Sequence, residues 1–163
     1  MAGVEGVIAL TFAHQRDYAH RTMTRVDFYF NAPAKAEVAR KLATKSFQAG
    51  QQALVYTRQP SQGQELDGLF WTAQQLSFLP HVRCGHPLAR ETPILIGDNP
   101  DELASADVLI NLEDETPAFF SRFARVMEIV TTEDEDRERA RARLRFFRER
   151  GYQVDTHDLA ATR

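Results

Sequence analysis

The sequence predicts an α/β protein, a three-layer α/β/α sandwich built around a mostly parallel sheet. Three observations support this prediction. Strand-like runs alternate with helix-like segments along the chain, which is typical of parallel strands joined by helices. Residues 93–97 (PILIG) and 107–112 (DVLINL) are largely apolar runs, as found in strands that are covered on both faces. The chain has 163 residues, enough for a single domain with a sizeable core.

Each element has a local signal. The first strand, VDFYF, is rich in aromatic residues, and Val38 and Leu42 lie at helical spacing in the helix that Gly50 ends. ALVYT is a buried type of strand, and Leu66 and Phe70 give the following helix an apolar side. In chain order the sequence predicts strands at 26–30, 53–57, 93–97, 107–112 and 126–130, and helices at 34–47, 65–72 and 117–125 before a final arginine-rich helix.

Two segments depart from this order. Residues 1–22 precede a second methionine, Met23, from which the regular pattern starts at once. We expect 1–22 to be an N-terminal extension, largely disordered, with an extra edge strand at 7–12 as the alternative, and 23–163 to be one α/β domain. Residues 76–92 form a long excursion containing Pro80 between a helix and a strand, and such excursions are often functional.

The final helix follows four consecutive acidic residues and has seven arginines within residues 137–150. Thr132 and Glu135 have the spacing of a capping box, and Gly151 can end the helix. At 100° per residue, an apolar stripe adjoins a cationic row. The stripe consists of Ala140, Leu144 and Phe147, and the row of Arg137, Arg141, Arg145 and Arg148.

This helix has two interpretations. A charge run is usually a solvated face, and on charge alone that interpretation is favoured. Outside the row, we expect Arg139, Arg143 and Arg150 to be ordinary surface charges. A cationic row beside an apolar stripe also suits an acidic ligand with one apolar end. Direct binding of single-stranded DNA is a third possibility, but the net charge of −3 and the lack of a clear aromatic platform count against it.

The sequence contains no recognisable catalytic or cofactor motif. None of its eight glycines forms a GxGxxG or GxxxxGK[ST] pattern, so a Rossmann-like fold without a nucleotide site is expected. His81, Cys84 and His86 are too crowded for a zinc site, and the acidic residues of 98–115 fit helix caps better than magnesium binding. His157 reads as a surface residue of the tail. We expect no catalytic residue, no cofactor and no metal.

The single cysteine fits a reducing cytosol, and no apolar run is long enough for a membrane span. With phosphate loop, metal set and catalytic constellation missing, an interaction module becomes the leading class of function. The runner-up is a nucleotide-dependent enzyme with a Rossmann-like fold, using the acidic strand ends.

Several motifs in order resemble the chi subunit of the bacterial DNA polymerase III clamp-loader assembly. They are TRVDFYF, LDGLFWTAQQLSFLPH, the pair PILIGD and DVLINL, and ETPAFFSRFARVMEIV followed by the basic helix and RGYQV. The resemblance covers about residues 23–159. It implies a cytoplasmic, replisome-associated adaptor without intrinsic activity, which contacts DNA only indirectly and does not contact membranes.

The resemblance implies two binding surfaces. One would bind the psi subunit of the clamp loader through Trp71, Phe78, Leu79 and Pro80, although Trp71 and Phe78 could also pack in the core of the domain. The other would bind the acidic C-terminal tail of single-stranded DNA-binding protein. Its residues would be Val130, Arg137, Arg141, Leu144 and Arg145, where Leu144 replaces the aromatic residue often present in the family.

Overall fold

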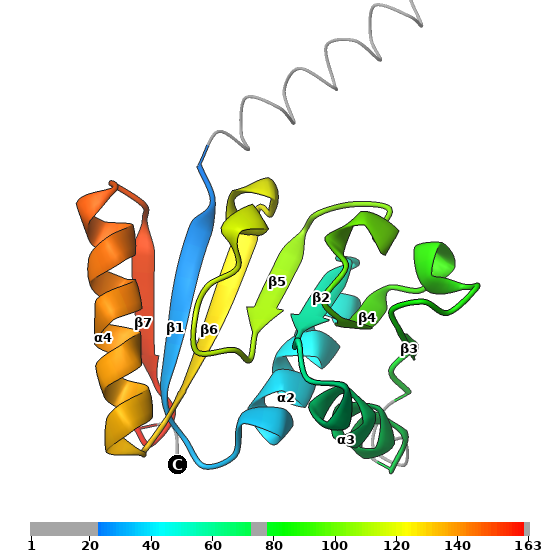
Figure 1. The fold of residues 1–163 in the computed structure, drawn as a ribbon, viewed down its shortest axis with the longest axis horizontal. Coiled ribbons are helices and arrows are strands. Elements are labelled where there is room, and N and C mark those ends of the chain that lie inside the picture. Colours follow the sequence, from blue (N-terminus) through cyan, green and yellow to red (C-terminus); the bar gives the residue numbers. More distant parts are fainter. Residues whose placement is uncertain (1–22, 73–77, 162–163) are drawn as a thin grey trace, which may run out of the picture.

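Seven short runs of residues pair into a single sheet in the computed structural model, which describes residues 23–72 and 78–161 (Figure 1). The strands are β1 (Arg25–Ala32), β2 (Ala53–Tyr56), β3 (His81–Arg83), β4 (Ile94–Gly97), β5 (Val108–Asn111), β6 (Arg125–Thr131) and β7 (Val154–Asp158). Their order is β3-β4-β2-β5-β6-β1-β7, and every ladder is parallel. The expectation of a mostly parallel sheet is confirmed.

Helices cover both faces of this sheet, so the predicted three-layer architecture is also confirmed. Helices α2 (Lys35–Gln48) and α3 (Pro60–Thr72) pack on one face, and α4 (Asp134–Glu149) packs on the other. The alternation along β1 separates the two cores: Phe28 faces α4, whereas Tyr29 faces α2. In Figure 1, α4 lies over the β7–β1 end of the sheet, and α3 lies near β3.

The sequence missed the two edge strands, β3 and β7. β3 has only three residues and lies inside the 76–92 excursion, where no strand was predicted. β7 reads VDTHD, and its polar residues show no apolar run. Both strands exist because the parallel neighbours β4 and β1 offer them backbone partners. Charged and short edge strands are also a common protection against unwanted pairing.

Three boundaries differ from the prediction. α3 begins at Pro60, five residues before the predicted start at residue 65, and proline favours the first helical position. The predicted helix 117–125 is a shorter 3-10 helix, Ala118–Arg122. The predicted capping box is wrong: Glu133 is the N-cap of α4 and makes no side-chain cap bond. Instead, the carboxylate of Asp136 accepts hydrogen bonds from the backbone N–H and hydroxyl of Thr131, at 2.8 and 3.0 Å.

His157 is not an ordinary surface residue of the tail. Its ring stacks on Tyr29 with 4.6 Å between centroids, and its Nε2 lies 2.8 Å from Oδ1 of the fully buried Asp27. Arg125 Nε donates to the other oxygen of Asp27 at 2.6 Å. Burial alone would raise the pKa of Asp27, but the hydrogen bonds from Arg125 and His157 hold the pKa below its ordinary value. These contacts join β7, β1 and β6 on the face away from α4.

Two further predictions concern the N-terminal extension and membrane-spanning helices. Residues 1–22 lie outside the described residues, so the N-terminal extension remains a prediction. Within 23–72 and 78–161, no helix combines the length and apolar character needed to cross a membrane.

Candidate functional site

The arginine helix lies with its apolar stripe on the sheet and its cationic row beside β1. Ala140 and Phe147 are fully buried, and Leu144 is partly buried against the same core cluster. Arg137 is partly buried, whereas Arg141 and Arg145 are exposed. The helical spacing therefore predicted the orientation of these residues correctly.

An open pocket of about 340 Å³ adjoins this row and is lined by Phe30, Asn31, Arg137 and Arg141. Phe30 and Asn31 lie at the carboxyl end of β1, about a hundred residues from the arginines in sequence. Sequence reasoning did not include either residue in the site. Their local sequence, an aromatic strand end followed by Asn-Ala-Pro, indicates a turn. It does not indicate that the arginines of α4 lie next to this turn.

Asn31 holds Arg137 in place. Its backbone has a φ of 61°, the left-handed region that asparagine tolerates better than most residues. Its side-chain oxygen accepts a hydrogen bond from Arg137 Nη2 at 2.8 Å, and its amide donates to Asp158 at 2.8 Å. The guanidinium of Arg137 is thereby fixed at the pocket before any ligand arrives.

The remaining arginines of the row are available for a ligand. Arg141 pairs with Glu138 at 2.9 Å, but both side chains are largely exposed, so solvent weakens this pair. Arg145 makes no ion pair with any residue of the described part. A row of guanidinium groups with free donors suits carboxylates, which arginine binds in a bidentate manner.

Val130 contributes differently from the prediction that it lines a pocket. It is fully buried in the core beneath α4 and does not line the pocket beside Arg137. Leu144 is the apolar residue of α4 that lies nearest in helical angle to Arg137. Phe30 and Leu144 are both partly buried apolar side chains on this face of the sheet.

Arg143 is not a surface charge, and that expectation is wrong. Its side chain is 7% exposed and its Nε lies 3.2 Å from Oε2 of Glu128, which is fully buried on β6. Arg143 Nη1 donates to the carbonyl of Asp114 at 2.6 Å. Asn111 and Thr116 also donate to the Glu128 carboxylate. Burial raises the pKa of Glu128, and the charge of Arg143 and these hydrogen bonds oppose that rise.

The residues predicted to bind psi divide into exposed and buried ones. Trp71 is 52% exposed and Phe78 is 61% exposed, which is unusual for side chains of this size. Leu79 is 2% exposed and belongs to the core beside α2 and α3, and Pro80 is partly buried. Residues 73–77, between Trp71 and Phe78, lie outside the described residues.

His81 supports the base of this surface. The Trp71 ring packs at 4.9 Å from the His81 ring, and Phe70 contacts His81 edge to face. Nδ1 of His81 bonds to the carbonyl oxygen of Leu79 at 2.7 Å, and its Nε2 lies 3.3 Å from Asp67. These contacts give His81 a structural role beneath Trp71. Among residues 23–72 and 78–161, no group of three His, Cys, Asp or Glu side chains is arranged to hold a metal ion.

The two surfaces lie at opposite ends of the sheet. The arginine row belongs to α4, which Figure 1 shows beside β7 and β1. Trp71 lies in α3 and Phe78 precedes β3, and β3 is the opposite edge of the sheet. Two ligands could therefore bind at once without contacting each other.

Residues 23–155 match the family model described as DNA polymerase III chi subunit, HolC. The chain belongs to this chi subunit family. The DNA polymerase III subunit chi of Pseudomonas aeruginosa is 37% identical over 141 residues, covering 84% of this chain and 98% of that protein. The Haemophilus influenzae chi subunit is 29% identical over 124 residues, covering 76% and 86% of the two chains. The Escherichia coli chi subunit is 26% identical over 118 residues, covering 71% and 80%.

Membership of the chi family makes the chain an accessory subunit of bacterial DNA polymerase III, with a role in DNA replication as part of a complex with other subunits. A comparison with solved structures finds proteins of similar fold. S. cerevisiae Dbp5 bound to RNA and ADP BeF3 has a TM-score of 0.56 at 11% identity, covering 83% of this chain but 41% of that one. A Dbp5 structure with Nup159, Gle1, IP6 and ADP has a TM-score of 0.57 at 10% identity, covering 82% and 41%. At these identities the similarity shows the fold alone.

Proposed function

We propose that this chi subunit is a non-catalytic adaptor, which binds the psi subunit of the clamp loader at one end of its sheet and the acidic C-terminal tail of single-stranded DNA-binding protein at the other. The observation that carries the proposal is the Phe30–Asn31 pocket beside Arg137 and Arg141, because it combines an apolar wall with one cation that is held in place and one that is exposed. Chi would then work in the bacterial cytoplasm, at the replisome, and contact DNA only through the binding protein.

The chemistry of the arginine row fits such a tail. Arginine forks bind carboxylates through two parallel hydrogen bonds, and the pre-set Arg137 loses less freedom on binding than a mobile side chain. The terminal aromatic ring of the tail would lie beside Phe30 and Leu144, and the acidic residues of the tail would contact Arg141 and Arg145. Arg141 and Arg145 are exposed, so their contacts are weak, and the function depends on many tails displayed along coated DNA, which raise the effective concentration.

Arg141→Ala is expected to weaken binding of the tail peptide about tenfold, because one charge-assisted contact is lost. Isothermal titration calorimetry at low ionic strength measures this, since salt screens exposed charges. Arg139→Ala is the matched control: it lies on the other flank of α4, beside Asp114 and Glu135, and should leave the affinity within about twofold. Equal affinities of the wild type and Arg141→Ala would contradict the assignment of this surface.

Phe78→Ala is expected to abolish co-purification with psi while the tail peptide still binds. Large exposed apolar side chains are typical anchors of protein interfaces, and losing one commonly weakens a complex by 2 kcal/mol or more, roughly thirtyfold. Leu88→Ala is the control, because Leu88 is also apolar and 51% exposed but belongs to a different loop. Psi that co-purifies equally with Phe78→Ala and the wild type would refute this half of the proposal.

A further inference from the structure

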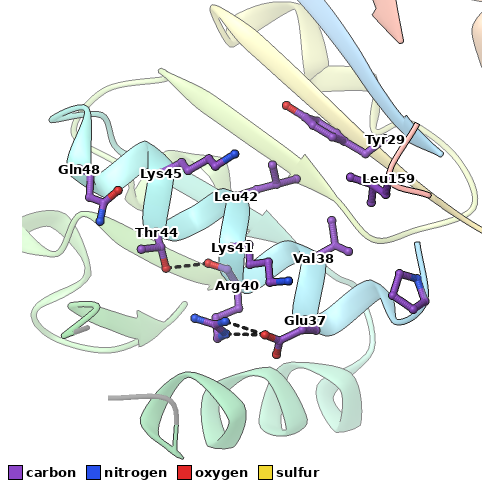
Figure 2. A pocket seen from close by; sticks show the side chains of 11 residues that line it. Tyr29, Glu37, Val38, Arg40, Lys41, Leu42, Thr44, Lys45, Gln48 and Leu159 are labelled. Atoms are coloured by element: carbon purple, nitrogen blue, oxygen red, sulfur yellow. Dashed lines mark hydrogen bonds and ion pairs between the residues drawn. The ribbon is translucent and has the colours of Figure 1, made fainter. Parts of the chain in front are cut away.

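A groove of about 550 Å³ runs along α2 on the sheet face opposite α4 (Figure 2). One side is formed by α2 from Glu37 to Gln48, and the other by Tyr29 of β1 and Leu159, which follows β7. Neither of the two surfaces assigned above includes any of these residues.

The shape of the groove favours a chain-like ligand. Residues 37–48 of a helix span about 18 Å, at 1.5 Å per residue. Five to six residues of an extended peptide cover roughly the same length, at about 3.3 Å per residue. A compact ligand would occupy only part of such a groove.

The charge of the groove is positive at its rim. Figure 2 shows the side chains of Lys41 and Lys45 on the side of α2 toward Tyr29 and Leu159, whereas Arg40 turns to its 2.6 Å ion pair with Glu37. Neither lysine makes an ion pair with another residue of the described ranges. The only three lysines of the sequence lie on α2, so the two flexible ammonium groups here are a local feature.

The floor of the groove is apolar, formed by Val38, Leu42 and Leu159. An aromatic platform for nucleotide bases is not available at Tyr29, because this residue is only 9% exposed and its ring already stacks on His157. An apolar floor below unpaired cations therefore matches an acidic peptide with apolar side chains better than a nucleic acid.

We propose that this groove is a second peptide-binding site, which takes an acidic segment of a protein partner in an extended conformation. Lys41 and Lys45 are one helical turn apart, about 6 Å, close to the 6.6–6.8 Å between alternate residues of a strand. Carboxylates at alternate positions would reach both lysines, and the intervening apolar side chains would contact Leu42 and Leu159. This inference goes beyond the proposed function, because it concerns the opposite face of the sheet and needs no free carboxyl terminus.

The test uses a blocked peptide of alternating Asp and Leu, acetylated and amidated so that it lacks a terminal carboxylate. It is titrated into the full-length ¹⁵N-labelled protein. Amide shifts are expected to concentrate at Thr44, Lys45, Gln48 and Leu159. The double variant Lys41→Gln/Lys45→Gln should weaken binding about tenfold or more, because two charge-assisted contacts are lost. The double variant Arg58→Gln/Arg90→Gln removes two charges from exposed residues elsewhere and should bind within about twofold.

Four results would overturn the inference: no shifts, shifts confined to α4, equal binding of the peptide with Asn in place of Asp, or saturation of the groove by oligo(dT) instead of the peptide. The tail peptide of single-stranded DNA-binding protein, titrated into the same lysine variant, separates the two proposals. It should still bind at α4, and a loss there would speak against the α4 site or its independence rather than against the groove.

Discussion

Replacing Arg143 by methionine is expected to lower the free energy of unfolding by about 3–5 kcal/mol, because it leaves the buried Glu128 carboxylate without its cation. Urea denaturation measures the difference. Arg139→Met is the matched control: this arginine lies four positions before Arg143 on the same helix and also contacts Asp114, but its side chain is 45% exposed. Solvent screens its pairs with Asp114 and Glu135, so its loss should cost less than about 1 kcal/mol.

The double variant Glu128→Gln/Arg143→Met should regain part of the lost stability. Glutamine keeps an oxygen for the hydrogen bonds of Thr116 and Asn111 but carries no charge that needs a partner. Equal stability of Arg143→Met and Arg139→Met would show that the buried pair contributes nothing beyond a surface charge.

The stability deficit of Arg143→Met should also depend on pH. Burial raises the folded-state pKa of Glu128 above its ordinary value of 4.5, and removing Arg143 raises it further. At a pH between the unfolded and the folded-state pKa of Glu128, the folded protein holds a proton that the unfolded chain has released, so stability falls as the pH rises. This window extends to higher pH in Arg143→Met than in the wild type. The deficit relative to the wild type should therefore be larger at pH 8 than at pH 5, whereas that of Arg139→Met should change little.

Phe147→Ala is expected to cost a similar amount, about 3–5 kcal/mol, because it empties a fully buried site in the core below α4. The Phe147 ring contacts Phe28, Phe120 and Tyr152, with centroids 6.1, 5.3 and 5.8 Å away. These contacts fix α4 on the sheet and thereby position the arginine row.

Its sequence neighbour provides the control. Phe146 is 37% exposed and carries Arg150 over its ring at 4.3 Å, so Phe146→Ala loses partly solvated contacts. We expect less than about 1.5 kcal/mol for Phe146→Ala in the same urea experiment. If the two substitutions cost the same, the assignment of Phe147 to the core side of α4 is wrong.

The central strands and the main helices could be predicted because their signals are local. Runs such as 93–97 and 107–112 are apolar enough to be strands in any parallel sheet, and they correspond to β4 and β5. β7 could not be predicted in this way. Its residues are polar, and it is a strand because it pairs with β1 and because His157 contacts Asp27 and Tyr29.

The candidate tail site was predictable only in part. Helical spacing places Arg137, Arg141 and Arg145 on one flank, and the structure agrees. Phe30 and Asn31 belong to the same pocket but come from a distant strand, and no local pattern connects them with α4. Likewise, sequence reasoning could not separate exposed Phe78 from buried Leu79, which are adjacent in the chain.

By itself the sequence determined the α/β class, the central strands, the arginine-rich helix and the absence of phosphate-binding glycine motifs, because periodicity and residue type express themselves locally. Only the tertiary structure decided which arginines face solvent. Arg141 and Arg143 are two positions apart and chemically identical, yet Arg143 is buried against Glu128 and Arg141 borders an open pocket. A helical period fixes the angle between two side chains, but the groups on the facing sheet determine which side is buried.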